Sequence, residues 1–146
     1  MKDLNMLSDE SQVLERKQSL SLRREGLESL CGMVNADTAC GTVVFGVAPD
    51  GRIVGVEPGD LDKAQRSLAE TIRCKFDPPI QCEMHVREIE NKRVLAVSAS
   101  RNCDIAYYEF DGRAFIREGT STRQLILAEK ASLQRSRFME TQPRLP

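Results

Sequence analysis

The sequence of 146 residues has no tryptophan and only one histidine, and aromatic residues make up 5% of it. The single histidine, His85, argues against a Ser-His-Asp or Cys-His catalytic site and excludes a metal site built from several histidines of one chain. Neither a GxGxxG motif nor a Walker A lysine is present, which argues against a doubly wound nucleotide-binding fold.

Cysteine is present, but not in the spacing of a zinc knuckle or a redox centre. The five cysteines are odd in number, and none forms a CxxC motif. We expect reduced thiols in a cytosolic protein, with Cys31, Cys74 and Cys82 acting as small core residues. The N-terminus has no apolar leader segment, and no apolar run approaches the length of a membrane span. These absences predict a cytoplasmic protein with no membrane partner.

Neither sign of charge is in excess. The chain has 21 lysine and arginine residues and 22 aspartate and glutamate residues, for a formal net charge of −1. A nucleic-acid partner would therefore need a local basic patch. The hydrophobic share of 40% and the charged share of 29% are typical of a soluble globular protein. We expect a single domain over residues 1–140 and a disordered tail over residues 141–146.

The strongest local signal is an apolar stretch in the first third of the chain. Residues 42–47 are nearly all β-branched or aromatic, which is typical of a strand buried on both faces. Pro49, Asp50 and Gly51 supply turn chemistry, and residues 53–56 resume the apolar run. The pattern predicts a hairpin through the middle of a sheet.

The rest of the chain predicts an α+β domain. A Ser121-x-x-Gln124 capping box predicts a C-terminal helix over residues 122–138, and Asp111-Gly112 predicts the turn of a second hairpin. The order of elements predicts a mixed, largely antiparallel sheet with hairpins, packed against about three helices. The other predicted elements are helices at residues 22–35 (with Ser21 as N-cap) and 61–76, strands at 14–20, 80–88 and 94–97, and the hairpin arms at 104–110 and 113–117.

Four motifs occur in order between residues 10 and 125. They are Glu15-x-Lys17-x-Ser19, the segment 34–41 that closes the first helix, the stretch from Phe45-Gly46-Val47 through Asp50-Gly51 to Val54-Gly55-Val56, and Phe115-Ile116-Arg117-x-Gly119-x-Ser121-x-Arg123. Together they resemble the Schlafen/AlbA-type DNA-binding domain family, once described as a divergent AAA domain. The resemblance implies a Schlafen AlbA-like fold and a domain that faces nucleic acid.

In its Schlafen branch, the resemblance also implies a metal-dependent endoribonuclease acting on structured RNA such as transfer RNA. Glu10, Glu15 and Lys17 stand at the spacing of that branch's catalytic motif. Glu10, Glu15 and Asp50 would bind Mg²⁺ or Mn²⁺ through carboxylate oxygens, and Lys17 would neutralise charge on the reacting phosphate. The sequence departs from the motif at Ala48-Pro49, where the family has its third acid, and Asp50 follows slightly later.

A phosphate-binding surface is predicted around the last motif. Arg117 and Arg123 bracket a loop that would lead into a helix N-terminus at Ser121, where backbone N–H groups and the helix dipole favour an anion. The simpler interpretation is that Ser121 only caps the helix. Arg23 and Arg24 would extend the same patch, and Lys17, which shares a strand face with Glu15, is also expected to contact phosphate. Of the other polar side chains, His85 is expected at the surface, and one of Tyr107 and Tyr108 is expected in the core.

Three functional hypotheses follow, in this order of preference. The first is a nucleic-acid-binding domain that contacts the phosphate backbone of DNA or RNA. The second is the metal-dependent endoribonuclease, and the third is a non-catalytic protein-interaction module. Because the Schlafen resemblance implies two similar lobes forming a positively charged clamp, we also expect a homodimer.

Overall fold

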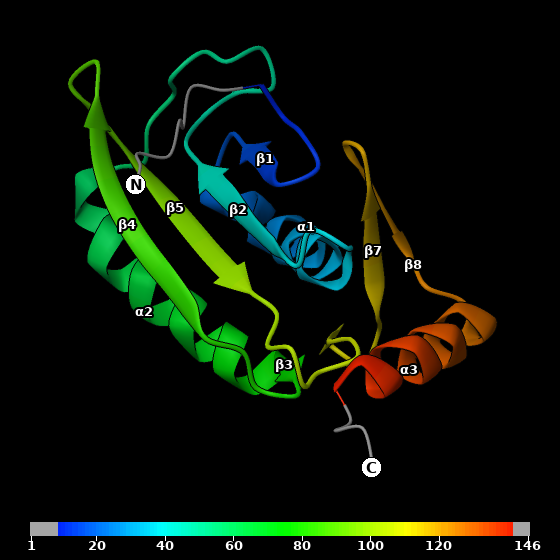
Figure 1. Cartoon of the computed structure of the whole chain (residues 1–146). Helices are drawn as coiled ribbons and strands as arrows, with labels where there is room; N and C mark the ends of the chain where they lie inside the picture. Colours follow the sequence, from blue (N-terminus) through cyan, green and yellow to red (C-terminus); the bar gives the residue numbers. More distant parts are fainter. Residues whose placement is uncertain (1–8, 142–146) are drawn as a thin grey trace.

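The computed structural model describes residues 9–141 and places a four-stranded mixed sheet at their centre (Figure 1). The strand order is β1 (Leu14–Lys17), β2 (Cys40–Phe45), β5 (Lys92–Ser100) and β4 (Cys82–Ile89). β1 runs parallel to β2, and the other two pairings are antiparallel. The predicted α+β class and the mixed, largely antiparallel sheet are confirmed.

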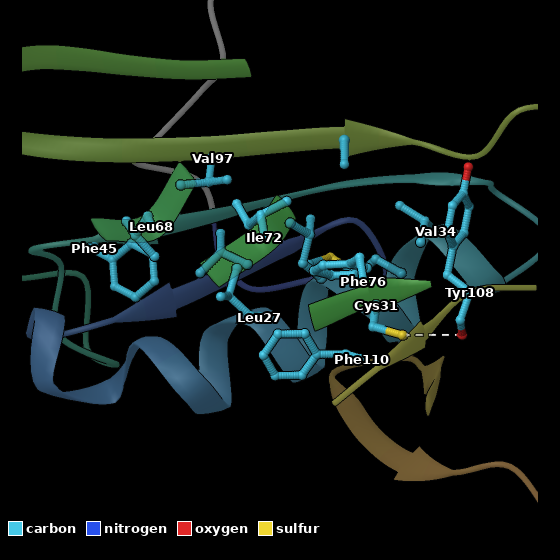
Figure 2. Close-up of a cluster of buried hydrophobic side chains, with 14 of the residues drawn as sticks. Leu27, Cys31, Val34, Phe45, Leu68, Ile72, Phe76, Val97, Tyr108 and Phe110 are labelled. Carbon is cyan, nitrogen blue, oxygen red and sulfur yellow. Dashed lines mark hydrogen bonds between the residues drawn. The ribbon is translucent and has the colours of Figure 1, made fainter. Parts of the chain in front are cut away.

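Two helices cover one face of this sheet. α1 (Arg23–Asn35) and α2 (Pro58–Lys75) bury their apolar stripes against β2 and β5, and this interface is the main core of the protein (Figure 2). A short 3-10 helix, η1 (Leu20–Leu22), precedes α1. Ser19 caps η1 by accepting a hydrogen bond from the Ser21 backbone N–H, so Ser21 is not the N-cap that we predicted for the first helix. The main core comprises Leu27, Leu30, Val34, Val43, Phe45, Leu68, Ile72, Leu95 and Val97, among others.

The opposite face of the sheet is covered in part by the connection between β2 and α2. This connection buries a second, smaller apolar cluster of Leu14, Val44, Val47, Ile53, Val94 and Ala96, which we call the outer cluster. β2 supplies side chains to both cores, so the prediction of a strand buried on both faces is confirmed.

The predicted central hairpin is wrong. The chain turns after β2, but the apolar run at residues 53–56 forms no strand of the sheet and makes only an isolated bridge between Val47 and Ile53. β1 and β5 already occupy the two edges of β2, so no edge is free for a hairpin partner. Gly46, at φ 107°, turns the chain out of the sheet, and its carbonyl accepts hydrogen bonds from the Val54 and Gly55 N–H groups.

The second predicted hairpin is correct in its turn and wrong in its pairing. Asp111 and Gly112 both have positive φ, and an isolated bridge joins Phe110 to Arg113. The flanking segments nevertheless pair elsewhere. β6 (Glu109–Phe110) pairs with β3 (Phe76–Asp77), and β7 (Phe115–Glu118) pairs with β8 (Ser121–Gln124). Of the predicted strand over residues 104–110 only residues 109–110 form a strand, whereas most of the predicted strand over residues 113–117 is present in β7. The pairing partners are set by tertiary packing.

The predicted capping box at Ser121 is also wrong. Ser121–Gln124 is a strand, β8, because Glu118 pairs with Ser121 across a tight turn at Gly119. The last helix, α3, starts later and spans Leu127–Thr141, and the Glu129 carboxylate accepts a hydrogen bond from the Ile126 N–H at its start. Thr141 thus belongs to a helix, and the rest of the predicted tail lies outside the described residues.

The cysteines are distributed differently from our expectation. Cys31 is buried and Cys82 is half-buried, but Cys74 is exposed on the outer side of α2. Over residues 9–141, no helix is long and apolar enough to cross a membrane.

Candidate nucleic-acid interface

The functional prediction centres on Glu15, and the structure gives this residue a buried cationic partner. Arg117 on β7 donates from Nη1 to Glu15 Oε1 at 2.5 Å. Only 1% of the Arg117 side chain and 9% of the Glu15 side chain are exposed. The same guanidinium donates to the backbone carbonyls of Ser11 and Leu14 and to the hydroxyl of Thr122. Arg117 is therefore a structural anchor that no phosphate can reach directly.

A second contact strengthens the attachment of the N-terminal segment to β7. The Gln12 side chain donates to the Arg117 carbonyl at 2.9 Å and accepts from the Gly119 N–H at 2.8 Å. Together with the Arg117 guanidinium, these bonds hold residues 11–15 against the β7–β8 hairpin. The first and the last of the four sequence motifs are thereby brought into one site.

Lys17 lies at the accessible side of this site. Its ammonium contacts Glu15 Oε2 at 2.8 Å, and 20% of its side chain is exposed. Lys17 lines a polar groove of about 260 Å³ between the start of α1 and the β7–β8 hairpin. We call this groove the α1–β7 groove. The lining residues of this groove are Glu15, Lys17, Glu25, Glu28, Ser29, Phe115, Arg117, Thr120 and Thr122.

The N-terminus of α1 lies beside the groove. Its N-cap residue, Leu22, provides no side-chain hydrogen bond to the first turn. Arg23 is exposed, and none of its contacts with the described residues is an ion pair. Arg24 is half-exposed and pairs with Asp111 at 2.8 Å and with Glu28 at 3.6 Å. The hydrogen bond from Arg24, assisted by Lys75, lowers the pKa of Asp111.

Arg123 and Ser121 lie apart from this site. Strand alternation directs Arg117 and Thr122 toward α1, whereas Arg123 is opposite Ile116 on the other face of the hairpin. There Arg123 pairs with Glu118 at 3.0 Å and Glu129 at 2.7 Å. Hydrogen bonding to Arg123 lowers the pKa of Glu129 to about 2. Because no helix begins at Ser121, the predicted phosphate site at that position is not formed.

The three predicted metal ligands do not converge. Glu10 Oε2 accepts the Arg16 N–H at 2.9 Å, Glu15 is held by Arg117 and Lys17, and Asp50 accepts the Arg52 N–H at 2.9 Å within its own turn. Among residues 9–141, no three aspartate, glutamate, histidine or cysteine side chains form a group that could hold a metal ion. The residues present do not fit Mg²⁺ or Mn²⁺, and nuclease activity stays a hypothesis.

Sequence reasoning missed several residues that build the site. Gln12 and Thr122 have no distinctive local pattern, and only their contacts with Arg117 reveal their roles. Asn35, the last residue of α1, is buried and joins α1 to two distant segments through Tyr108 and Phe115. Two sequence signals were available for Asn35: it follows the predicted apolar stripe by one residue, and it lies in the motif at residues 34–41. The prediction that one of Tyr107 and Tyr108 lies in the core is confirmed, and the buried residue is Tyr108.

The comparisons agree with this architecture. The model of the family described as Schlafen, AlbA_2 matches residues 10–126, so the chain belongs to the Schlafen AlbA_2 family. The matched range contains all the elements of the α1–β7 groove. No curated protein matches the sequence.

Two solved structures share the fold. The DIP2311 protein of Corynebacterium diphtheriae superposes with a TM-score of 0.62 at 19% identity, covering 86% of this chain and 27% of that one. The chain thus spans about a quarter of that protein. The N-terminal domain of a Nitrosomonas europaea protein described as related to the ATP-dependent DNA helicase RecG superposes with a TM-score of 0.61 at 23% identity. There the coverage is 87% of this chain and 95% of that domain.

Proposed function

We propose that the protein binds nucleic acid through the phosphate backbone, at the N-terminus of α1 and the adjoining α1–β7 groove. The observation that carries the proposal is a pair of exposed arginines, Arg23 and Arg24, in the first turn of α1, with the Lys17 ammonium in the groove beside that turn. Membership of the Schlafen AlbA_2 family and the likeness to a domain of a RecG-related protein support it.

The chemistry of this surface suits a phosphate. η1 leads directly into α1, and the Leu20 carbonyl already accepts the Arg23 N–H, so the arginine and lysine side chains would make the phosphate contacts. The helix dipole adds partial positive charge there. Arg23 can contact a phosphate without first breaking an ion pair with a described residue. Arg24 would exchange Asp111 for the phosphate at little cost, because ion pairs at the surface stabilise by only about 0–1 kcal/mol.

The acidic residues of the groove set a limit on affinity. Glu25 and Glu28 line the same groove as Lys17, so the local field is nearly balanced and not strongly positive. We therefore propose modest affinity, dependence on salt and little sequence preference, since the proposed contacts are to phosphates and phosphate contacts carry no sequence information. Arg117 and Glu15 act as positioning residues that hold Lys17 and the β7–β8 hairpin in place.

The direct test is fluorescence anisotropy with labelled single-stranded DNA, single-stranded RNA, duplex DNA and transfer RNA over a series of salt concentrations. We expect the double variant Arg23→Glu/Arg24→Glu to bind about tenfold more weakly and with a shallower salt dependence. Lys17→Ala should weaken binding in the same direction. The four probes separate a DNA-binding protein from an RNA-binding one.

The matched control reverses two exposed arginines on α2, in the variant Arg66→Glu/Arg73→Glu. Both double variants replace two exposed arginines with glutamates, so the change in net charge is the same. Arg66 and Arg73 pair with Asp62 and Glu70 on α2. Equal loss of binding in both double variants would show that only net charge matters and would reject the proposed surface. Absence of binding to every probe would favour the protein-interaction module.

A further inference from the structure

Among the described residues, 9–141, the outer edge of β4 is the longest strand edge without a pairing partner. β4 (Cys82–Ile89) pairs with β5 over eight consecutive residues without a bulge, and within residues 9–141 no strand pairs with its other side (Figure 1). An open edge presents a row of backbone N–H and C=O groups that can pair with another strand. The segment contains no proline, and apart from Glu88 the residues that face the helices are apolar. Within the part of the chain that the structure describes, surface charges are therefore the only protection of this edge against pairing.

Those charges are self-complementary. Glu83, His85 and Arg87 alternate along the face of β4 that points away from the helices, and Glu83 and Arg87 are both exposed. In an antiparallel pair formed by two copies of one strand about a two-fold axis, each residue faces the residue equally distant from the axis. An axis at His85 places Glu83 of each copy opposite Arg87 of the other.

The same axis also matches the face that points toward the helices. Met84 and Val86 lie one residue on either side of His85. Met84 of each copy would therefore face Val86 of the other copy across the interface. Both are only partly buried and pack at the margin of the main core, whereas residues 94–97 in the neighbouring β5 are fully buried. A second β4 would therefore cover apolar surface that the monomer leaves partly exposed.

We propose that the protein forms a homodimer by antiparallel pairing of two β4 strands, with the two-fold axis at His85. The pairing joins the two four-stranded sheets into one continuous sheet. Each interface contains two Glu83–Arg87 pairs and two Met84–Val86 contacts. Directly opposite side chains in an antiparallel pair have Cβ atoms about 4.5–5.5 Å apart, close enough for both kinds of contact. The α1–β7 groove is not part of this surface, so the proposal is independent of nucleic-acid binding.

Sedimentation equilibrium across a series of protein concentrations tests the proposal. The wild-type chain should self-associate, and either Glu83→Arg or Arg87→Glu should weaken association about tenfold or more, because each puts two like-charged pairs at the interface. The double variant Glu83→Arg/Arg87→Glu should restore association to near the wild-type level. As matched controls, Asp62→Arg and Arg66→Glu reverse an exposed ion pair on α2 and should leave association unchanged.

A second measurement needs no variant. Hydrogen exchange of the amides of residues 82–89 should slow as the wild-type concentration rises, while exchange in α3 should not change. A chain that stays monomeric up to millimolar concentration would overturn the proposal. So would a dimer that the single reversals do not weaken, or one that forms without added protection in β4, because either result would place the interface on another surface.

Discussion

Arg117 and Glu15 lie 102 positions apart in the sequence, and their side chains meet at 2.5 Å in a buried site. This contact joins the edge strand β1 to the β7–β8 hairpin, which belongs to a separate sheet. It also fixes the carboxylate that contacts Lys17. The pair thus connects the stability of the fold to the shape of the α1–β7 groove.

Replacing Arg117 should destabilise the protein strongly. Arg117→Met leaves Glu15 buried with Lys17 as its remaining partner and removes the donors to two backbone carbonyls, so we expect the free energy of unfolding to fall by about 3 kcal/mol. Chemical denaturation followed by circular dichroism measures it. Arg123→Met on the same hairpin is the control and should cost under about 1 kcal/mol, because its ion pairs are exposed. Equal losses in the two variants would contradict a structural role for Arg117.

Asn35 should be a second stability hot spot. Its buried amide donates to the Tyr108 and Phe115 carbonyls and accepts from the Tyr108 N–H. Asn35→Ala leaves those backbone groups without partners, and we expect a loss of about 3 kcal/mol in the free energy of unfolding. The control is Asn102→Ala at an exposed position, which should change stability little. A small effect at Asn35 would mean that water replaces the lost hydrogen bonds.

The ion-pair cluster at Arg123 should be visible in acid titrations. Because hydrogen bonding to Arg123 lowers the pKa of Glu129 from 4.5 to about 2, this pair contributes stability above pH 4.5 and loses it as the pH falls toward 2. In Arg123→Gln, the pKa of Glu129 should return toward 4.5, and the decline in stability over that window should be shallower. NMR titration of the Glu129 carboxyl measures it. A pKa near 4.5 for Glu129 in the wild type would contradict its ion pair with Arg123. High salt should reduce the pKa shift, because the side chains of Arg123, Glu118 and Glu129 face solvent.

Thiol reactivity should follow burial. Cys40, Cys74 and Cys103 are exposed, whereas desolvation raises the pKa of Cys31 to about 12 and that of Cys82 to about 11. At neutral pH we expect fast alkylation at the three exposed positions and slow alkylation at the other two, because the thiolate is the reactive form. Mass spectrometry of native and denatured samples resolves the sites. Rapid native modification of Cys31 would show that the main core opens readily.

Divalent metal ions should have little effect on the protein. Glu10, Glu15 and Asp50 each have another partner and do not meet. We therefore expect neither Mn²⁺ nor Mg²⁺ to raise the melting temperature, and no cleavage of transfer RNA in their presence. The control for any cleavage is Glu15→Gln. Metal-dependent cleavage that this substitution abolishes would restore the endoribonuclease hypothesis and require the carboxylates to move together.

The elements that sequence predicts well are those defined by local pattern. The stripe of Leu27, Leu30 and Val34 places α1 correctly, and the alternation from Cys82 to Arg87 places β4 correctly, because one buried face fixes each period. The errors arise where two partners compete for one segment. Ile53 is apolar, yet it packs in the outer cluster because both edges of β2 are taken.

Local sequence pattern is also insufficient to predict the geometry of the candidate site. Spacing singled out Glu15, Lys17 and Arg117 as site residues, but it could not reveal that Arg117 is buried against Glu15. Ser121 satisfies a capping-box pattern and also fits a tight β-turn after Gly119. Only the contacts of β7 and β8 with α1 decide between them. Burial and pairing between distant segments are properties of the folded chain and leave little trace in local sequence.

β2 has a consequence for how the sheet is aligned. Usually a one-residue shift of a strand exposes its apolar side chains, and this penalty fixes the alignment. β2 is apolar on both faces, so a shift would exchange Val43 and Val44 between the two cores without exposing either one. The alignment must depend on features that are not interchangeable. A Cβ at Gly41 would lie 2.4 Å from Met33 Cβ, and Thr42 bonds to Ser98 across the strand pair. Gly41 and Thr42, at the start of β2, thus fix the alignment of β2 with its neighbours in the sheet.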